Sequence, residues 1–177
     1  ENGVNFIDTA EGYADGIAES ILGKVLKEYR REDLVVSTKI FWGGSGPNDQ
    51  GLSRKHLIEG IRNSLKRLQL EYVDIVYCHR PDPQVPMEEV VWAMDQILRN
   101  GQALYWGTSE WSAEQIEKAH IVAKELNCMP PIVEQPQYNL IVKKRVEEEY
   151  APIYAKYGMG LTTFSPLASG VLSGKYL

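Results

Sequence analysis

Apolar positions follow two alternating patterns along this chain. Short runs in which most residues are apolar are typical of buried strands, whereas apolar residues that recur every three or four positions are typical of amphipathic helices. The runs that predict strands are residues 5–10, 34–40, 72–79, 103–109, 131–135 and 160–165. Because helical stripes alternate with these runs, the pattern predicts an α/β fold with a parallel sheet and right-handed crossovers.

The helical stripes carry start and stop signals of their own. The stripes consist of Ala18, Ile21, Leu22, Val25 and Tyr29; Leu57, Ile58, Ile61, Leu65 and Leu68; Val90, Val91, Met94, Ile97 and Leu98; Ile116, Ala119, Ala123 and Leu126; and Val146, Tyr150, Ile153 and Tyr157. Gly23 weakens the first helix, and Ser53 is suited to cap the second. Ser112 and Gln115 have the spacing of a capping box. Pro152 must start, kink or divide the last helix, because proline lacks a backbone N–H.

Composition narrows the class of protein. The 177 residues are 44% hydrophobic and contain no low-complexity linker, which indicates one domain over residues 1–177. A net charge of −5 with scattered Lys and Arg favours neither a nucleic-acid partner nor a polybasic membrane patch. Without an apolar run near the roughly 20 residues of a membrane span, or a signal-peptide pattern, we expect a cytoplasmic protein. Cys78 and Cys128 lack metal-ligand spacing, so we expect reduced thiols and no metal site.

Ionisable residues stand at or just beyond the carboxyl ends of three successive predicted strands. These residues are Asp8, Tyr13, Lys39 and His79. A doubly wound dinucleotide-binding sheet needs a Gly-rich turn after its first strand, and residues 8–13 lack that spacing. A closed (β/α)8 TIM barrel spreads its functional side chains over many strand ends, so the barrel is the preferred fold.

Only part of such a barrel is accounted for. The pattern supplies six of the eight strands, and a sheet of six strands would have two unpaired edge strands and an open core. Residues 1–3 also look like the end of a helix. We therefore expect a fragment of about six βα units, with the first and last strands outside it.

The residue types at the strand ends suit one kind of reaction. A tyrosine with a pKa near 10 exchanges a proton near neutral pH more easily when a cation favours the phenolate, and Lys39 could supply that charge to Tyr13. Asp8 is placed to be the counter-ion of Lys39, and His79 to hydrogen-bond a carbonyl oxygen. Together they would protonate an oxygen whose carbon accepts hydride. Because no side chain donates hydride, a nicotinamide cofactor is required.

The same residues also have structural interpretations. Asp8 and Lys39 could form an ion pair that only stabilises strand ends, and an isolated His79 is more often structural, as we expect of His56. Phe164 could be barrel packing, and Trp42 could be core. The loop of residues 43–51 is longer than a usual βα connection, so it either covers a pocket or is a mobile insertion.

Longer runs bear a resemblance to a known family. They are DTAEGY at 8–13, TKIFWGG at 38–44, GLSRKH at 51–56, LQLEYVD at 68–74, HRPDP at 79–83, YWGTS at 105–109 and SPLASG at 165–170. The sequence resembles the aldo-keto reductase superfamily, most closely the branch that contains the β subunits of voltage-gated potassium channels. The resemblance covers the whole chain.

The resemblance implies an NADPH-dependent oxidoreductase that reduces aldehydes or ketones to alcohols. It implies that Tyr13 is the general acid, that Lys39 lowers its pKa, that Asp8 holds Lys39 and that His79 orients the carbonyl. It further implies nicotinamide contacts from Ser109 and Gln135, stacking by Phe164 and a pocket wall at Trp42. A cofactor loop that meets the pyrophosphate of NADPH or NADP+ would include Ser165, Leu167, Gly170, Ser173 and Lys175.

A second function follows from the same resemblance. The chain could be an NADP(H)-binding accessory subunit that modulates a potassium channel, with a channel α subunit as its partner and a homo-tetramer as its assembly. His79 favours the reductase, whose partner is a small carbonyl substrate, because animal channel β subunits have Asn at this position. Glu110 departs from relatives with Asn or Arg, which weakens the case for one nicotinamide contact.

Overall fold

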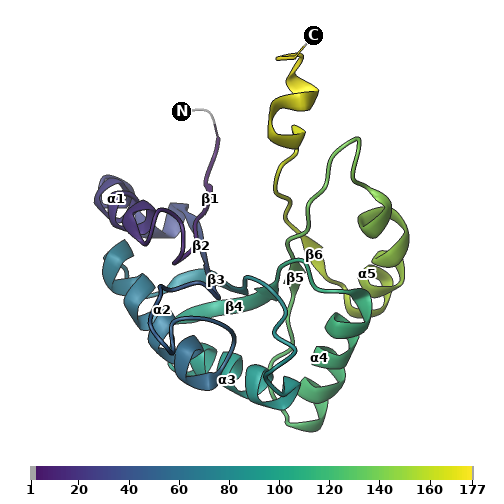
Figure 1. Ribbon diagram of the computed structural model, residues 1–177. Helices are drawn as coiled ribbons and strands as arrows, with labels where there is room; N and C mark the ends of the chain where they lie inside the picture. Colours follow the sequence, from purple (N-terminus) through teal and green to yellow (C-terminus); the bar gives the residue numbers. More distant parts are fainter. Residues whose placement is uncertain (1–2, 177) are drawn as a thin grey trace.

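The computed structural model describes residues 3–176, and its centre is a parallel sheet of six strands in chain order. The strands are β1 (Phe6–Asp8), β2 (Val35–Ile40), β3 (Val73–Cys78), β4 (Ala103–Thr108), β5 (Val133–Glu134) and β6 (Gly160–Leu161). The sheet curls, and its helices lie along the outer side (Figure 1). This arrangement is an incomplete (β/α)8 barrel, which confirms the predicted fold and all six predicted strands.

The described residues form five α-helices, three of which begin where the sequence signals place them. They are α1 (Ile17–Leu26), α2 (Arg54–Leu68), α3 (Met87–Arg99), α4 (Ala113–Glu125) and α5 (Ala151–Tyr157), with short 3₁₀ helices η1 (Arg31–Asp33) and η3 (Ala168–Ser173) and a π-helical turn η2 (Arg145–Glu149). Ser53 accepts a hydrogen bond from the His56 amide, and Ser112 with Gln115 forms the expected capping box. Pro152 lies in the first turn of α5, so it starts that helix.

The core lies between the sheet and helices α2 to α4. Leu57 and Ile61 of α2, Ile97 of α3 and Trp106 of β4 are fully buried in it. Within the described residues, no helix is long and apolar enough to span a membrane. The register pairs Asp8 with Ser37 and Lys39 with Tyr77, so the carboxyl ends of neighbouring strands share one edge of the sheet. This edge is where the candidate residues gather.

The face that α1 buries coincides only in part with its apolar stripe, of which Leu22 packs against the core. Ile21 and Val25 have exposed fractions of 58% and 45%, whereas Glu19 and Gly23 are buried. The reason is a contact with α2: the Glu19 carboxylate pairs with Arg67 at 2.7 Å, and Gly23 packs directly against the backbone there. Because Glu19 is satisfied by a partner 48 residues away, the local apolar pattern could not reveal this face.

We expect Gly23→Ala to destabilise the protein even though alanine favours helices. A Cβ at this position would lie 2.5 Å from the Leu68 carbonyl oxygen and 2.6 Å from that of Arg67. The helices must separate to relieve this overlap, at a cost of about 1–3 kcal/mol. Urea unfolding measures the change, and Lys24→Ala on the exposed side of α1 is the control, expected within about 0.5 kcal/mol of the parent. A Gly23→Ala protein as stable as the parent would show that α1 does not pack this closely.

Candidate active site

A buried lysine connects the first two strand ends. Lys39 is fully buried, and its ammonium pairs with the carboxylate of Asp8. The ammonium also donates to the Thr9 carbonyl oxygen at 2.8 Å and to the Tyr13 hydroxyl oxygen at 3.2 Å. An ammonium has three N–H donors, so these contacts use all of them. Because the Tyr13 oxygen accepts from Lys39, its own proton is available to point elsewhere.

Tyr13 lies in the loop between β1 and α1, which is anchored just before it. The Glu11 carboxylate is buried and accepts from the Phe41 amide at 2.7 Å and from His56 at 2.9 Å. The Glu11 amide in turn donates to the Lys39 carbonyl oxygen at 3.1 Å. His56 therefore has the structural role expected for it. Tyr13 as a whole residue is 42% exposed, so the loop is fixed while this side chain is not enclosed by the described residues.

His79 follows β3 and packs beside the tyrosine. Its ring lies edge-on to Tyr13, with centroids 5.8 Å apart, and to Trp42, with centroids 4.9 Å apart. Burial, followed by the charges of Lys39 and Arg80, lowers the pKa of His79 to about 3. The imidazole is therefore neutral at physiological pH, and its buried Nδ1 has no partner among the described residues. A neutral imidazole can donate one hydrogen bond to a carbonyl oxygen.

Trp42 stands at the base of the long loop after β2. The loop of residues 43–51 is closed at its base by a bridge between Trp42 and Gln50 and by a 2.9 Å bond from the Gly51 amide to the Phe41 carbonyl oxygen. The indole is 40% exposed and contacts the His79 ring. The structure thus brings Trp42 together with the four predicted catalytic residues.

Three residues predicted to contact a nicotinamide follow the next strands. Ser109, after β4, donates through its hydroxyl to the Gln135 carbonyl oxygen at 2.8 Å. The Gln135 side-chain amide, after β5, donates to the Thr162 hydroxyl at 3.1 Å. Phe164 follows β6 and pairs with Gln137 in an isolated parallel bridge. Ser109 and Gln135 are buried, and all three residues lie at the same edge of the sheet as the tetrad.

The predicted cofactor-loop residues lie apart from this group. They belong to the segment after β6, which extends away from the sheet (Figure 1). Ser165 bonds to Asn139 through its carbonyl oxygen at 3.0 Å, and the Ser173 hydroxyl donates to the Gly170 carbonyl oxygen at 2.8 Å. The Lys175 ammonium lies 5.5 Å from the Tyr176 ring centroid, and Leu167 is 55% exposed. In the described chain, none of these contacts joins the segment to the tetrad.

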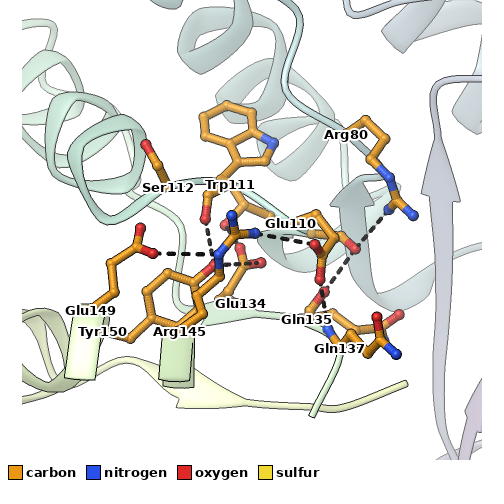
Figure 2. Close-up of polar contacts among 12 residues, drawn as sticks. Arg80, Glu110, Trp111, Ser112, Glu134, Gln135, Gln137, Arg145, Glu149 and Tyr150 are labelled. Atoms are coloured by element: carbon orange, nitrogen blue, oxygen red, sulfur yellow. Dashed lines mark hydrogen bonds and ion pairs between the residues drawn. The ribbon is translucent and has the colours of Figure 1, made fainter. Parts of the chain in front are cut away.

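A polar cluster that the sequence did not single out supports the ends of β4 and β5. Figure 2 shows the Glu110 carboxylate directed toward the Gln137 amide, at 2.6 Å, and toward Arg145, at 3.1 Å. Glu110 has a φ of 59°, which places it in the left-handed region. Its side chain is therefore engaged with the segments after β5. This accounts for a residue that departs from the Asn or Arg expected from the resemblance.

Glu134 is the buried centre of this cluster. Its carboxyl accepts from the Thr108 hydroxyl at 2.5 Å and lies 3.5 Å from the Tyr150 hydroxyl, which donates to the Trp111 carbonyl oxygen (Figure 2). Burial raises the pKa of Glu134 to about 8, although the hydrogen bond from Thr108 opposes this. The carboxyl is therefore largely protonated at neutral pH. No sequence signal marked it, because an isolated Glu in a strand has no distinctive pattern.

The raised pKa of Glu134 predicts that stability falls with rising pH. The native state keeps a proton that the unfolded state loses above about pH 4.5, so stability is lost between about pH 4.5 and pH 8. Glu134→Gln should remove this part of the pH dependence, worth about 2–5 kcal/mol. Chemical unfolding at several pH values measures it, with the exposed Glu148→Gln as control. Identical pH slopes in the Glu134→Gln protein and the parent would show that this carboxyl is ionised when folded.

Comparisons with known proteins agree with this geometry. The sequence profile of the Aldo/keto reductase family matches residues 1–177. A rice protein named "Probable voltage-gated potassium channel subunit beta" is 61% identical over 176 residues, and an Arabidopsis thaliana protein of the same name is 58% identical over 178 residues. These matches cover 98% and 99% of this chain and 54% of each relative, so the chain spans about half the length of these relatives.

A solved structure shows the same arrangement of the backbone. A thermostable aldo-keto reductase in complex with the inhibitor epalrestat superimposes with a TM-score of 0.81 at 34% sequence identity. The match covers 95% of this chain and 57% of that one. The six-stranded sheet therefore corresponds to part of a longer fold in each of these proteins.

Proposed function

The chain belongs to the aldo/keto reductase family of oxidoreductases, and from this we propose that it carries the proton-transfer site of an NADPH-dependent reductase of aldehydes and ketones. The observation that carries the proposal is the buried Lys39 ammonium, held between the Asp8 carboxylate and the Tyr13 hydroxyl oxygen. A tyrosine whose oxygen faces a fixed cation is suited to give up its proton, because the cation stabilises the phenolate that remains.

The nicotinamide site is supported by the donors beyond β4 and β5. The Gln135 side-chain amide has two N–H donors and an acceptor oxygen, and within the described residues one N–H is used by Thr162. Together with the Ser109 hydroxyl, these groups suit the carboxamide of a nicotinamide, and Phe164 is the aromatic at the same edge. When bound, such a cofactor supplies the hydride that no side chain carries.

The side chains then divide the remaining work. His79, neutral because of its lowered pKa, donates a hydrogen bond that orients the carbonyl oxygen of the substrate. As the carbonyl carbon accepts hydride, Tyr13 gives its proton to that oxygen, which yields an alcohol and a phenolate facing Lys39. Asp8 keeps Lys39 in place through their ion pair. Trp42 lines the substrate side of His79.

The test is direct turnover by the full-length protein. We expect NADPH absorbance to fall when 4-nitrobenzaldehyde is added and the corresponding alcohol to accumulate in equal amount. Parallel reactions with NADH measure the preference between the two cofactors. Purified protein that binds NADPH but consumes none with a panel of aromatic and aliphatic aldehydes and ketones would refute the reductase function.

A second function is favoured by the names of the relatives in rice and Arabidopsis thaliana. Both are called probable β subunits of a voltage-gated potassium channel, so this chain is also a candidate channel partner. The test is co-purification of the full-length protein with the cytoplasmic domain of a potassium-channel α subunit. Mass measurement of the complex shows whether the protein is a homo-tetramer. If the two proteins do not associate, the channel function is refuted and only the reductase function remains. If they do associate, both functions can hold, because they are compatible.

A further inference from the structure

Arg80 is a charged residue of the site that the proposed reaction does not use. It follows His79 after β3, and its guanidinium donates to the His79 carbonyl oxygen at 2.5 Å and to the Ser109 hydroxyl at 3.3 Å. Its central carbon lies 5.3 Å from the ring centroid of Trp42 and 5.9 Å from that of Phe164. The guanidinium therefore lies between the proposed substrate wall and the proposed nicotinamide contacts, and Figure 2 shows it reaching toward the latter.

No carboxylate among the described residues 3–176 pairs with Arg80. Among the described residues, the other partly buried arginines, Arg31, Arg67 and Arg145, each pair with a carboxylate. Arg80 is also partly buried, and it pairs with none there. Both of its hydrogen bonds come from one nitrogen, Nη1, although a guanidinium carries five N–H donors. The two remaining nitrogens are thus the part of Arg80 that can bind an anion.

We propose that Arg80 binds a carboxylate on the carbonyl substrate, so that the site prefers aldehydes and ketones bearing an acidic group. This inference rests on the proposed reductase function. A guanidinium matches a carboxylate with paired N–H donors, and flanking aromatic rings hold its plane. The position beside Trp42 and His79 puts the charge near the carbonyl that His79 would orient. The phosphates of the cofactor are the competing anions, and the residues expected to meet them lie on the separate segment after β6.

The experiment compares an acid with its methyl ester, which lacks the negative charge and carries one extra methyl group. Full-length protein is assayed with 3-carboxybenzaldehyde and with its methyl ester, and the ratio of their kcat/KM values is the readout. We expect the parent to favour the carboxylate and Arg80→Gln to lower the ratio by about 10- to 100-fold, the effect of losing a charge-assisted hydrogen bond. Arg80→Lys should restore part of the ratio, because it keeps the charge without the planar fork.

Arg54→Gln is the matched control. Arg54 also lies over a tryptophan, 5.1 Å from the Trp92 ring centroid, but on α2 away from the tetrad. Its replacement removes the same charge and the same kind of contact, so the substrate ratio should stay within about twofold of the parent. Circular dichroism and thermal melting of each variant establish that it is folded.

A second readout does not depend on turnover. Calorimetry measures binding of 3-(hydroxymethyl)benzoate and of its methyl ester to the NADP+-bound protein, and Arg80→Gln should weaken the acid alone. If the parent consumes no NADPH, the reductase function fails while this measurement still decides whether Arg80 binds carboxylates. Equal affinity of the parent for acid and ester would overturn the proposal. So would an Arg80→Gln protein whose affinity for NADPH falls while its substrate ratio is unchanged, which would assign Arg80 to the cofactor phosphates.

Discussion

Replacing Tyr13 with phenylalanine is expected to lower the kcat of carbonyl reduction by about 10²- to 10⁴-fold, the contribution of a positioned proton donor. The change removes only the hydroxyl that lies 3.2 Å from the Lys39 ammonium. The Glu11 side chain that anchors the loop keeps its bonds to the Phe41 amide and to His56. The loop should therefore keep its shape, and the loss should come from the missing proton.

Binding and chemistry are separated by measuring each alone. Fluorescence titration with NADPH should give a Kd within about threefold of the parent, because Tyr13 is not among the groups proposed to hold the cofactor. Tyr29→Phe, at an exposed position just after α1, is the control and should leave kcat unchanged. Turnover at the parent rate in Tyr13→Phe would show that another group protonates the oxygen.

The sequence predicted the strands and their order well, because each strand reads as a local apolar run; β2 and β3 are largely buried, whereas the edge strands β1 and β6 are mostly exposed. The starts of α2 and α4 were predictable because capping is also local. Ser53 and Ser112 each accept a hydrogen bond from the backbone amide three residues later in the chain. The buried face of α1 was not predictable from its stripe. Burial of Glu19 depends on Arg67, which only the packing of α1 on α2 brings into reach.

The candidate site divides in the same way. The proximity of Asp8 and Lys39 could be predicted because parallel strands place their carboxyl ends at one edge, whereas Tyr13, in the loop after β1, was assigned through the family resemblance. Arg80 and Glu134 could not, since their significance lies in what surrounds them: aromatic rings from two distant loops for Arg80, and low-dielectric burial for Glu134. The position of a residue in the sequence shows neither that Arg80 lacks a counter-ion among the described residues nor that the pKa of Glu134 is raised.

Asp8 and Lys39 have two interpretations, a structural ion pair and a catalytic relay, and a double-mutant experiment separates them. Asp8→Asn leaves the fully buried Lys39 ammonium without its counter-charge, and we expect it to destabilise the protein by about 3–5 kcal/mol. Lys39→Met leaves the Asp8 carboxylate, whose side chain is 31% exposed and can be hydrated, so the expected loss is smaller, about 1–3 kcal/mol.

The double variant, Asp8→Asn with Lys39→Met, removes both charges together. It should recover much of the stability lost in Asp8→Asn, because an apolar side chain of similar volume replaces an unpaired buried charge. Its kcat should nevertheless remain about 10²- to 10³-fold below the parent, since no cation then faces the Tyr13 hydroxyl. The second substitution would therefore restore stability without restoring turnover.

Urea unfolding and steady-state kinetics on the same four proteins provide the measurement. The exposed pair Lys55 and Glu59 is the matched control, and Lys55→Met should change stability by less than about 1 kcal/mol and leave kcat unaltered. If the double variant regains both its stability and its turnover, Lys39 serves only to balance Asp8. If the double variant regains its stability but not its turnover, the positive charge beside Tyr13 is itself required for proton transfer. The loss of turnover could then not be ascribed to a damaged fold.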